Sequence, residues 1–198
     1  IPDFLDDIVD KLVDCLFSLN TPTHKNPLFN GASEFKIGNY LEYLTGLDYK
    51  SNKIINNIGQ IYIARNKKNL LFFDAGLPPP KKYSKNYQSG PLSFEYFIDN
   101  HKIITNCGFG NKISAKAELV SRLTSAQSTL CMNDSSVTRF ERNSLINKTF
   151  GTSIKSSFKV YDFNAEENID SLSIFAKHDA YKYNFNYLHE RKITINKK

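Results

Sequence analysis

The first part of the chain carries apolar residues at helical spacing. Between Phe4 and Phe17 they recur as pairs every four positions, which places them on one face of a helix with 3.6 residues per turn. The Asn-Thr-Pro run at 20–22 predicts the end of this helix, because proline cannot continue it. After a turn-rich loop over 26–35, the pattern predicts a second, shorter helix over 37–47.

From about residue 57 the apolar period changes to two, which is typical of half-buried β-strands. Turn residues separate the alternating runs, and a long Pro-containing loop covers 76–90. The region 108–127 is less regular and predicts at most one short helix. The predicted strands cover 60–66, 69–74, 92–98, 102–106, 128–132, 157–163, 171–178 and 187–195.

The order of helices first and strands second favours a mainly β fold, in which an antiparallel β-sandwich follows a helical end. Hydrophobic residues make up 40% of the 198 residues and charged residues 23%, which is sufficient for a packed core. The 15 Phe and 11 Tyr agree with this interpretation, because strands favour aromatic side chains.

The net charge of +6 and the pI of about 9.1 favour an acidic partner, such as nucleic acid, a membrane surface or an anionic polysaccharide. The lysines are scattered, with short pairs at 67–68 and 81–82, so an ordinary solubilising surface explains the charge equally well. No apolar run reaches the length of a membrane span, and we therefore expect no membrane partner.

The chain has three cysteines, Cys15, Cys107 and Cys131. Their odd number and the lack of a Cys-x-x-Cys pair argue against a disulfide framework and against a zinc-thiolate site, although a single bridge stays open. The simplest interpretation is that they are three small buried hydrophobic residues.

Two of the four histidines form a candidate pair. His24 and His101 fall in a loop and a tight turn, where we expect them to be exposed. His178 ends one predicted strand and His189 lies near the start of the next, so the two side chains could face each other across a hairpin. Such a pair is either a functional site or a hydrogen-bonded pair at the strand edge. None of the four has the spacing of a zinc signature.

Other local motifs are weaker. The chain has no Gly-x-Ser-x-Gly elbow. The segment NCGFGNK at 106–112 lacks the third glycine of a dinucleotide-binding loop and favours a turn or bulge. Basic and aromatic residues alternate over 177–192, which would suit single-stranded nucleic acid, but an ordinary β-hairpin explains them better. We therefore expect no nucleic-acid partner.

Several segments, taken in order, resemble the heparinase II/III-like family of bacterial polysaccharide lyases. The resemblance covers nearly the whole chain and implies the last helices of an α/α toroid over 1–50, followed by a β-sandwich (supersandwich) over 51–198 of a longer protein. The segments are PLFNGASEF (27–35), LLFFDAGLPPP (70–80), SGPLSFEYF (89–97), IITNCGFG (103–110), RLTSAQSTLCMND (122–134), FAKHDAY (175–181) and YLHERKITI (187–195).

The resemblance also implies a chemistry, which is β-elimination on a uronate-containing anionic polysaccharide in the periplasm or cell envelope. This reaction needs a neutraliser for the uronate carboxylate, a base for the C5 proton and an acid for the leaving oxygen. In the family the toroid supplies a neutraliser and a tyrosine, which would lie before Ile1. The catalytic candidates within this chain are His178, His189 and Tyr181.

The sequence departs from the family at three positions. Gln88 and Gln127 stand where the family has histidines, and Asn106 stands where members with a structural metal have an aspartate. Because amide carbonyls are poor partners for zinc and a glutamine cannot act as a base, we expect no metal and no cofactor. An amide still binds a carboxylate or a sugar hydroxyl. The substrate-binding candidates are Gln88, Asn106, Gln127 and Arg191, and the alternative function is a non-catalytic glycan-binding or envelope protein.

Overall fold

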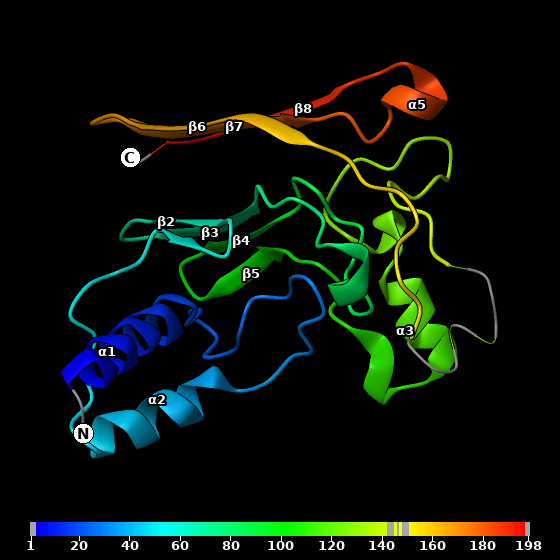
Figure 1. The fold of residues 1–198 in the computed structure, drawn as a ribbon. Coiled ribbons are helices and arrows are strands. Elements are labelled where there is room, and N and C mark those ends of the chain that lie inside the picture. The colour runs from blue at the N-terminus through cyan, green and yellow to red at the C-terminus, as the bar shows by residue number, and fades with distance from the viewer. Residues whose placement is uncertain (1–2, 142–144, 146, 148–150, 197–198) are drawn as a thin grey trace.

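The computed structural model describes residues 3–141, 145, 147 and 151–196 (Figure 1). Two helices lead the chain, α1 over Asp3–Ser18 and α2 over Ile37–Gly46, as the apolar spacing predicts. The loop between them returns along the sheet that follows, and its Phe29 packs against that sheet. Among the described residues, no helix is long and apolar enough to cross a membrane.

Two antiparallel sheets form the body of the chain. The larger sheet has the order β1-β2-β3-β4-β5 and the smaller sheet has the order β6-β7-β8, and they lie as two layers in Figure 1. The strands are β1 (Asn57–Ile58), β2 (Ile61–Arg65), β3 (Asn69–Asp74), β4 (Phe94–Ile98), β5 (His101–Ile104), β6 (Val160–Glu167), β7 (Ser171–His178) and β8 (His189–Asn196). This arrangement confirms the predicted antiparallel sandwich.

The main core lies between the two sheets. Leu71 and Phe73 of β3 pack there against Leu172 and Ile174 of β7. The opposite face of the larger sheet is also buried, because Phe72 and other residues of that face contact Leu19 and Phe29 of the N-terminal segment. The larger sheet is therefore covered on both faces, which explains why five of the six β3 residues are buried.

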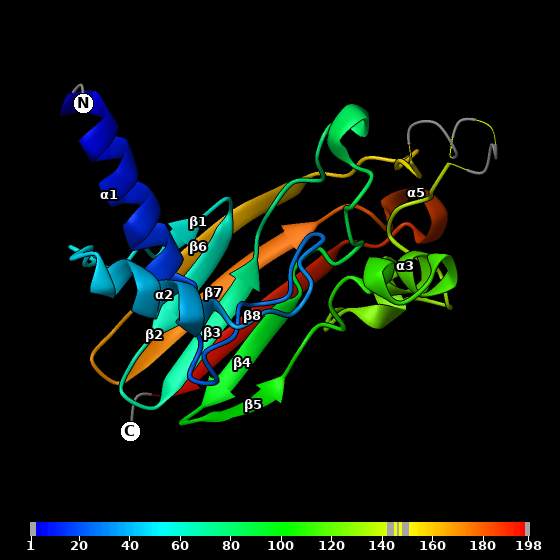
Figure 2. The ribbon, with the colours of Figure 1, turned by 90° about the horizontal axis from the view of Figure 1, so that it is seen from below.

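Short helical turns lie in the connections between strands. They are η1 (Lys81–Tyr83), η2 (Gly110–Lys112), α3 (Ala115–Ser121), η3 (Thr124–Ala126) and α5 (Lys182–Phe185). A Cβ on Gly110 would lie 2.6 Å from the Ala117 carbonyl oxygen, so this glycine allows the 106–112 loop to pack directly on α3. Figure 2 shows α3 at one end of the sheets.

Some local predictions are wrong. The segment 128–132 is not a strand, because side chains take the backbone hydrogen bonds of Ser128: its N–H donates to Asn106 Oδ1, and its carbonyl accepts from Arg191. The strand expected over 157–163 begins only at Val160. The cysteines are not buried: Cys107 is exposed and the other two are partly exposed, all as free thiols.

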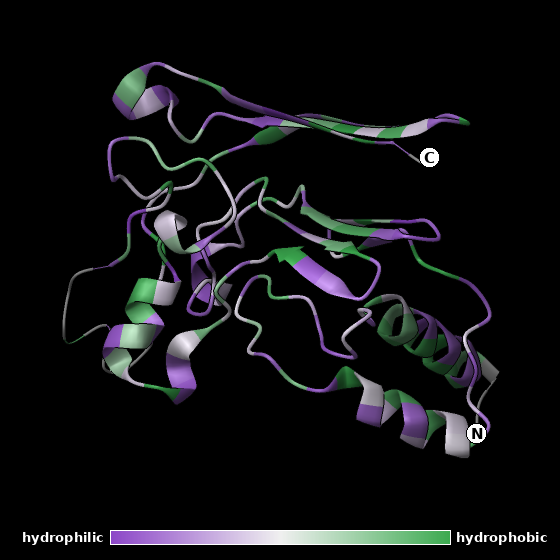
Figure 3. Cartoon of the chain, turned by 180° about the vertical axis from the view of Figure 1, so that it is seen from behind, coloured by the Kyte–Doolittle hydropathy of each residue, from purple (hydrophilic) through white to green (hydrophobic). Residues whose placement is uncertain are grey.

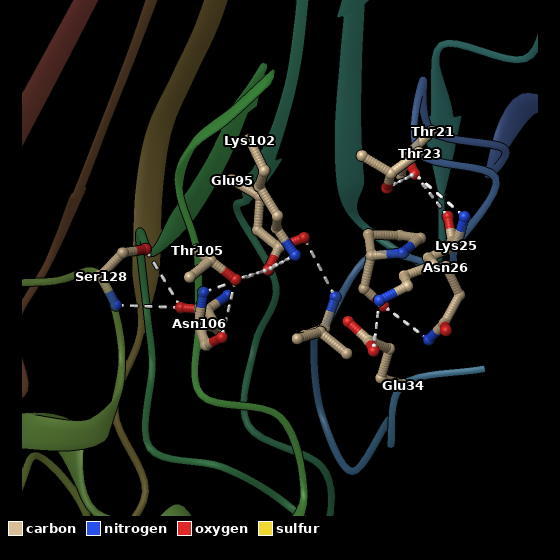
Figure 4. A network of polar contacts seen from close by, with 12 residues as sticks. Thr21, Thr23, Lys25, Asn26, Glu34, Glu95, Lys102, Thr105, Asn106 and Ser128 are labelled. Carbon is tan, nitrogen blue, oxygen red and sulfur yellow. Dashed lines mark hydrogen bonds and ion pairs between the residues drawn. The ribbon is translucent and has the colours of Figure 1, made fainter. Parts of the chain in front are cut away.

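A buried carboxylate ties the N-terminal loop to the larger sheet (Figure 4). The Glu95 side chain on β4 is fully buried. Its Oε1 accepts hydrogen bonds from Thr105 Oγ1 at 2.9 Å and from Asn106 N at 3.1 Å, and it pairs with Lys102 Nζ at 3.0 Å. Its Oε2 accepts from Leu28 N at 3.2 Å. Because a buried charge is costly without partners, these four donors make its burial possible.

We expect Glu95→Gln to lower the free energy of unfolding by about 3 kcal/mol, because it removes the charge that four donors share and places an NH₂ group among them. Urea denaturation measures this loss. The matched control is Glu34→Gln, which breaks the exposed ion pair with Lys25 and should cost less than about 1 kcal/mol. Equal stability of the two variants would contradict the assigned role of Glu95.

Candidate functional site

The Gln88 side chain joins three loops at the end of the larger sheet. It is 1% exposed. Its Oε1 accepts from Gly31 N at 2.9 Å, and its Nε2 donates to the carbonyls of Gly108 and Ser121, both at 2.9 Å. All of these partners are backbone groups. Gln88 therefore holds the 27–35 loop in place in this structure, and its assignment as a substrate contact stays a prediction.

Gln127 and Asn106 lie in the same cluster of loops. Gln127 Nε2 donates to the Ser121 carbonyl at 2.7 Å, so two glutamine amides converge on this one oxygen. Ser121 is the last residue of α3, where carbonyls lack a partner within the helix, and the two amides supply it. Asn106 Oδ1 accepts from Ser128 N at 2.9 Å and from its hydroxyl at 3.0 Å. Asn106 Nδ2 is buried without a hydrogen-bond partner in the described part of the chain.

We call Gln88, Asn106 and Gln127 the amide cluster. Its glutamines direct N–H groups toward a carbonyl, whereas a zinc ion needs lone pairs from imidazole, thiolate or carboxylate. In the part of the chain that the structure describes, no three His, Cys, Asp or Glu residues group as metal ligands. These residues do not fit the metal of the metal-binding family members, and a site without a metal stays our expectation.

His178 and His189 meet across the β7–β8 pairing, in direct register. The Ala180 N–H donates to His178 Nδ1 at 3.2 Å, so the proton of the neutral His178 ring lies on Nε2. That Nε2 lies 2.9 Å from His189 Nδ1 and donates to it. His189 then carries its own proton on Nε2. The two rings form a directed chain of hydrogen bonds in which each is neutral.

Burial lowers the pKa of both histidines, to about 3 for His178 and about 4 for His189, and the proximity of the two rings adds to the shift of His178. Protonating His189 at Nδ1 would also place two N–H groups opposite each other. A base with a pKa near 4 takes a proton from carbon poorly at neutral pH. The pair is therefore suited to holding β7 to β8, and its catalytic role stays a prediction.

The two other candidates are also engaged inside the protein. Tyr181 is 1% exposed, donates from its hydroxyl to the Leu130 carbonyl at 2.7 Å, and accepts from Met132 N at 3.3 Å. Burial raises the pKa of Tyr181 to about 12. Arg191 Nη1 donates to the Leu92 carbonyl at 2.8 Å and to the Ser128 carbonyl at 2.7 Å, which links the smaller sheet to loops of the larger one.

The sequence patterns missed a buried arginine. Arg122 is fully buried and forms no ion pair within 4 Å with a carboxylate of the described residues. Its guanidinium donates to the carbonyls of Tyr87, Thr152 and Ser84 at 2.7–2.9 Å and stacks on the Phe140 ring at 4.4 Å. Burial lowers the pKa of Arg122 to about 10. Arg122 therefore fixes the long loop before β4 through the carbonyls of Ser84 and Tyr87. Its carbonyl partners have no local sequence signature.

Asp74 was also missed. It ends β3 and is 3% exposed. It accepts from Gly76 N at 2.8 Å and, more weakly, from Asn30 Nδ2 at 3.4 Å. Because this environment does not offset the cost of burying a charge, burial raises the pKa of Asp74 to about 7. In the sequence, Asp74 is marked only by its place in the segment LLFFDAGLPPP (70–80).

The fold defines the class of the protein as an antiparallel two-sheet sandwich whose end loops are cross-linked by buried polar side chains. The family model "Heparinase II/III-like, C-terminal" matches residues 53–198. The chain belongs to this heparinase II/III-like family. The chain is thus related to polysaccharide lyases, as the sequence motifs predict. No curated protein matches the chain.

Solved structures of heparin-type lyases share the fold. A heparan sulfate lyase from Pedobacter heparinus aligns with a TM-score of 0.66 at 15% identity, over 100% of this chain and 32% of its own length. A structure of heparinase III aligns with a TM-score of 0.64 at 12% identity, over 98% and 33%. At these identities the likeness shows the fold alone. The chain spans about a third of the length of these structures.

We expect Gln88→Glu to lower the free energy of unfolding by at least about 2 kcal/mol at neutral pH. The new carboxylate oxygen would face the Gly108 and Ser121 carbonyls in place of an N–H donor. The same amide-to-acid change at the exposed Asn100 is the control and should stay within about 0.5 kcal/mol of the parent. Chemical denaturation measures both. Parent-like stability of Gln88→Glu would contradict the role of the amide.

The histidine pair predicts a pH dependence of stability. Each pKa is lower in the folded protein than the ordinary 6.5, so the unfolded chain binds more protons below pH 6.5 and the pair loses stability as pH falls from 6.5 toward 4. Asp74 acts in the opposite direction. Its folded pKa of about 7 lies above 3.8, so its stability contribution is lost as pH rises between these values. The two effects cancel in part.

Asp74→Asn should therefore expose the contribution of the histidines. In this variant we expect the free energy of unfolding to fall by at least about 1 kcal/mol between pH 6.5 and pH 4. Adding His189→Gln should reduce this slope, whereas adding His101→Gln at the exposed first residue of β5 should preserve it. A slope that is unchanged by His189→Gln would show that the pair does not cause it.

Proposed function

We propose that this chain is the sandwich part of a polysaccharide lyase that cleaves a uronate-containing anionic polysaccharide by β-elimination. The observation that carries the proposal is the family match over 53–198 together with the docking of the 27–35 loop on the end of that sandwich. By its resemblance to the family, we propose that this loop lies at the end of a helical domain. The sandwich therefore supports the edge of a substrate cleft that a helical domain would complete.

The leading helices support the presence of such a helical domain. Phe4, Ile8 and Leu12 of α1 and Tyr40 and Tyr43 of α2 are exposed, although α1 is amphipathic. Figure 3 shows hydrophobic positions, in green, alternating with hydrophilic ones along α1. An exposed apolar stripe of this kind suits packing against further helices. We propose that residues 1–50 are the last helices of an α/α toroid, which supplies the tyrosine and the neutraliser of the reaction.

The chemistry assigned to this chain is that of positioning. Leu28 N and Gly31 N bind Glu95 and Gln88, so the loop between the helices keeps one conformation. A fixed loop lowers the entropic cost of aligning substrate with the catalytic groups. The basic charge of +6 suits an anionic polymer, and the location that the family resemblance implies for the lyase is the periplasm or cell envelope.

One observation favours a second candidate function, a glycan-binding protein without lyase activity. The family histidines are replaced by Gln88 and Gln127, and both amides are used for internal hydrogen bonds. The described histidine pair is a poor base, because the pKa values of His178 and His189 are low, and neither glutamine amide accepts a proton. On this account the protein would hold an acidic glycan without cleaving it.

We expect the full-length protein, which includes the proposed helical domain, to generate ultraviolet absorbance from the new carbon-carbon double bond when it is incubated with uronate polysaccharides. Heparan sulfate and alginate are the polymers to test first, with neutral dextran as the control. The reaction needs a proton beside a carboxylate, so dextran should give no signal. Activity on a uronate polymer excludes the second candidate function.

A protein that is inactive on all uronate polymers would support the second candidate. In that case Gln88→His with Gln127→His tests whether the amides alone account for the lack of activity. We expect at most a weak gain, because each new imidazole would face the α3 carbonyl at Ser121. Restored activity would instead show that the chain lost its function through these two replacements.

A further inference from the structure

A basic groove lies around the β2–β3 turn, at the end of the larger sheet that is remote from the amide cluster. Two adjoining pockets of about 380 and 540 Å³ share Arg65, Asn66, Lys67 and Asn69. Strand β3 runs from Asn69 in this groove to Asp74 near the amide cluster. A strand of this length separates the Cα atoms of its two end residues by roughly 16 Å. Figure 2 shows the strand leading from the turn toward the end where α3 lies. The groove is thus separate from the site described above.

The larger pocket is positively charged. Arg65, Lys67 and Lys68 contribute cations, and Asp99 is the only acidic residue among its lining residues. Lys67 and Lys68 are exposed and form no ion pair with any residue that the structure describes. Their charges are therefore available for a ligand. Net positive charge in a concave site attracts anions more strongly than the same charge on a flat surface.

The groove is held open by a rigid frame. Arg65 Nη2 donates to the carbonyls of Ser18 and Asn20 at 3.3 and 2.9 Å, which fastens the end of α1 beside the turn. Asn66 Oδ1 accepts from the backbone of Lys68 and Asn69 at 2.9 and 2.7 Å, so the turn itself is fixed. The two lysines thus project from an ordered turn, and a ligand would not need to order the backbone.

The remaining lining favours a sugar over a bare anion. Asparagine amides, which both donate and accept hydrogen bonds, line the larger pocket at four positions. Asn20 is one of them, and its Oδ1 is buried without a partner in the described chain, so a rotation that brought it to a hydroxyl donor would satisfy it. The smaller pocket adds the Tyr62 ring and Glu167. An uncharged sugar suits that pocket and an acidic group suits the larger one.

We propose that this groove binds an acidic saccharide chain, with its sulfate or carboxylate groups near Lys67 and Lys68 and a neutral sugar near Tyr62. The positive charge of the groove supports a polyanionic ligand by itself, and the choice of a saccharide among polyanions rests on the proposed function. The groove would hold the polymer away from the amide cluster and so increase the residence of a long chain on the protein.

The probe is a short fraction of dextran sulfate, which carries sulfates but no uronate and so cannot undergo β-elimination. Binding is measured by calorimetry with the purified protein. We expect Lys67→Gln with Lys68→Gln to weaken binding about tenfold. The matched control is Lys112→Gln with Lys116→Gln, which removes the same charge from exposed positions near α3 and should change the affinity less than twofold.

Further arms separate the possible ligands. Neutral dextran should bind at least tenfold more weakly than dextran sulfate. The Asn20→Ala variant should bind dextran sulfate more weakly than the parent does. Its affinity for inorganic sulfate should be unchanged, because sulfate has no hydroxyl to donate. Absence of dextran sulfate binding, or equal loss in the two lysine double variants, would overturn the proposal. Tighter binding of single-stranded DNA through Lys67 and Lys68 would overturn it in favour of nucleic acid. A failed lyase assay leaves this measurement unaffected.

Discussion

The buried Glu95 carboxylate is the interaction on which the arrangement of the loops depends. An ionised carboxylate in a core is stable only if donors surround it, and here the donors come from β5, from the segment after β5 and from the loop between α1 and α2. These segments must therefore assemble in one arrangement for any of them to be stable. Residues that lie 67 positions apart, Leu28 and Glu95, are joined in this way.

The amide cluster extends this arrangement to the next loops. Gln88 connects the same 27–35 loop to the carbonyl end of α3, and Gln127 reaches the same carbonyl. The two glutamine amides thus cross-link loops at the end of the sandwich. An amide has no proton-accepting nitrogen, so this stabilising role does not require the glutamines to take part in catalysis.

Regular alternation predicted much of the fold, because the period of two and the turn residues mark most strands of the sandwich. The same alternation placed His178 opposite His189, since neighbouring antiparallel strands fix the register of facing residues. It failed where side chains take over backbone hydrogen bonds, as Asn106 and Arg191 do at Ser128. It also suggested one buried face for β4, whereas Phe97 is buried on the other face by the N-terminal segment.

The candidate residues were found by resemblance, but their partners were not. Gln88 and Gln127 were identified as replaced positions, yet their hydrogen bonds reach backbone groups that no side-chain pattern marks. Arg122 was missed for the same reason, because carbonyl oxygens exist at every residue. The tautomers of the histidine pair likewise follow from one backbone N–H, that of Ala180. Tertiary geometry alone supplies this information.

Glu95 and Gln88 hold the 27–35 loop on the sandwich, and amide hydrogen exchange at two backbone positions tests this. Leu28 N and Gly31 N donate to these two side chains, whereas a free surface loop would donate to water. We expect slow exchange at both amides in the parent protein, with Gly31 becoming fast in Gln88→Ala while Leu28 stays protected. Fast exchange at both amides in the parent protein would contradict it.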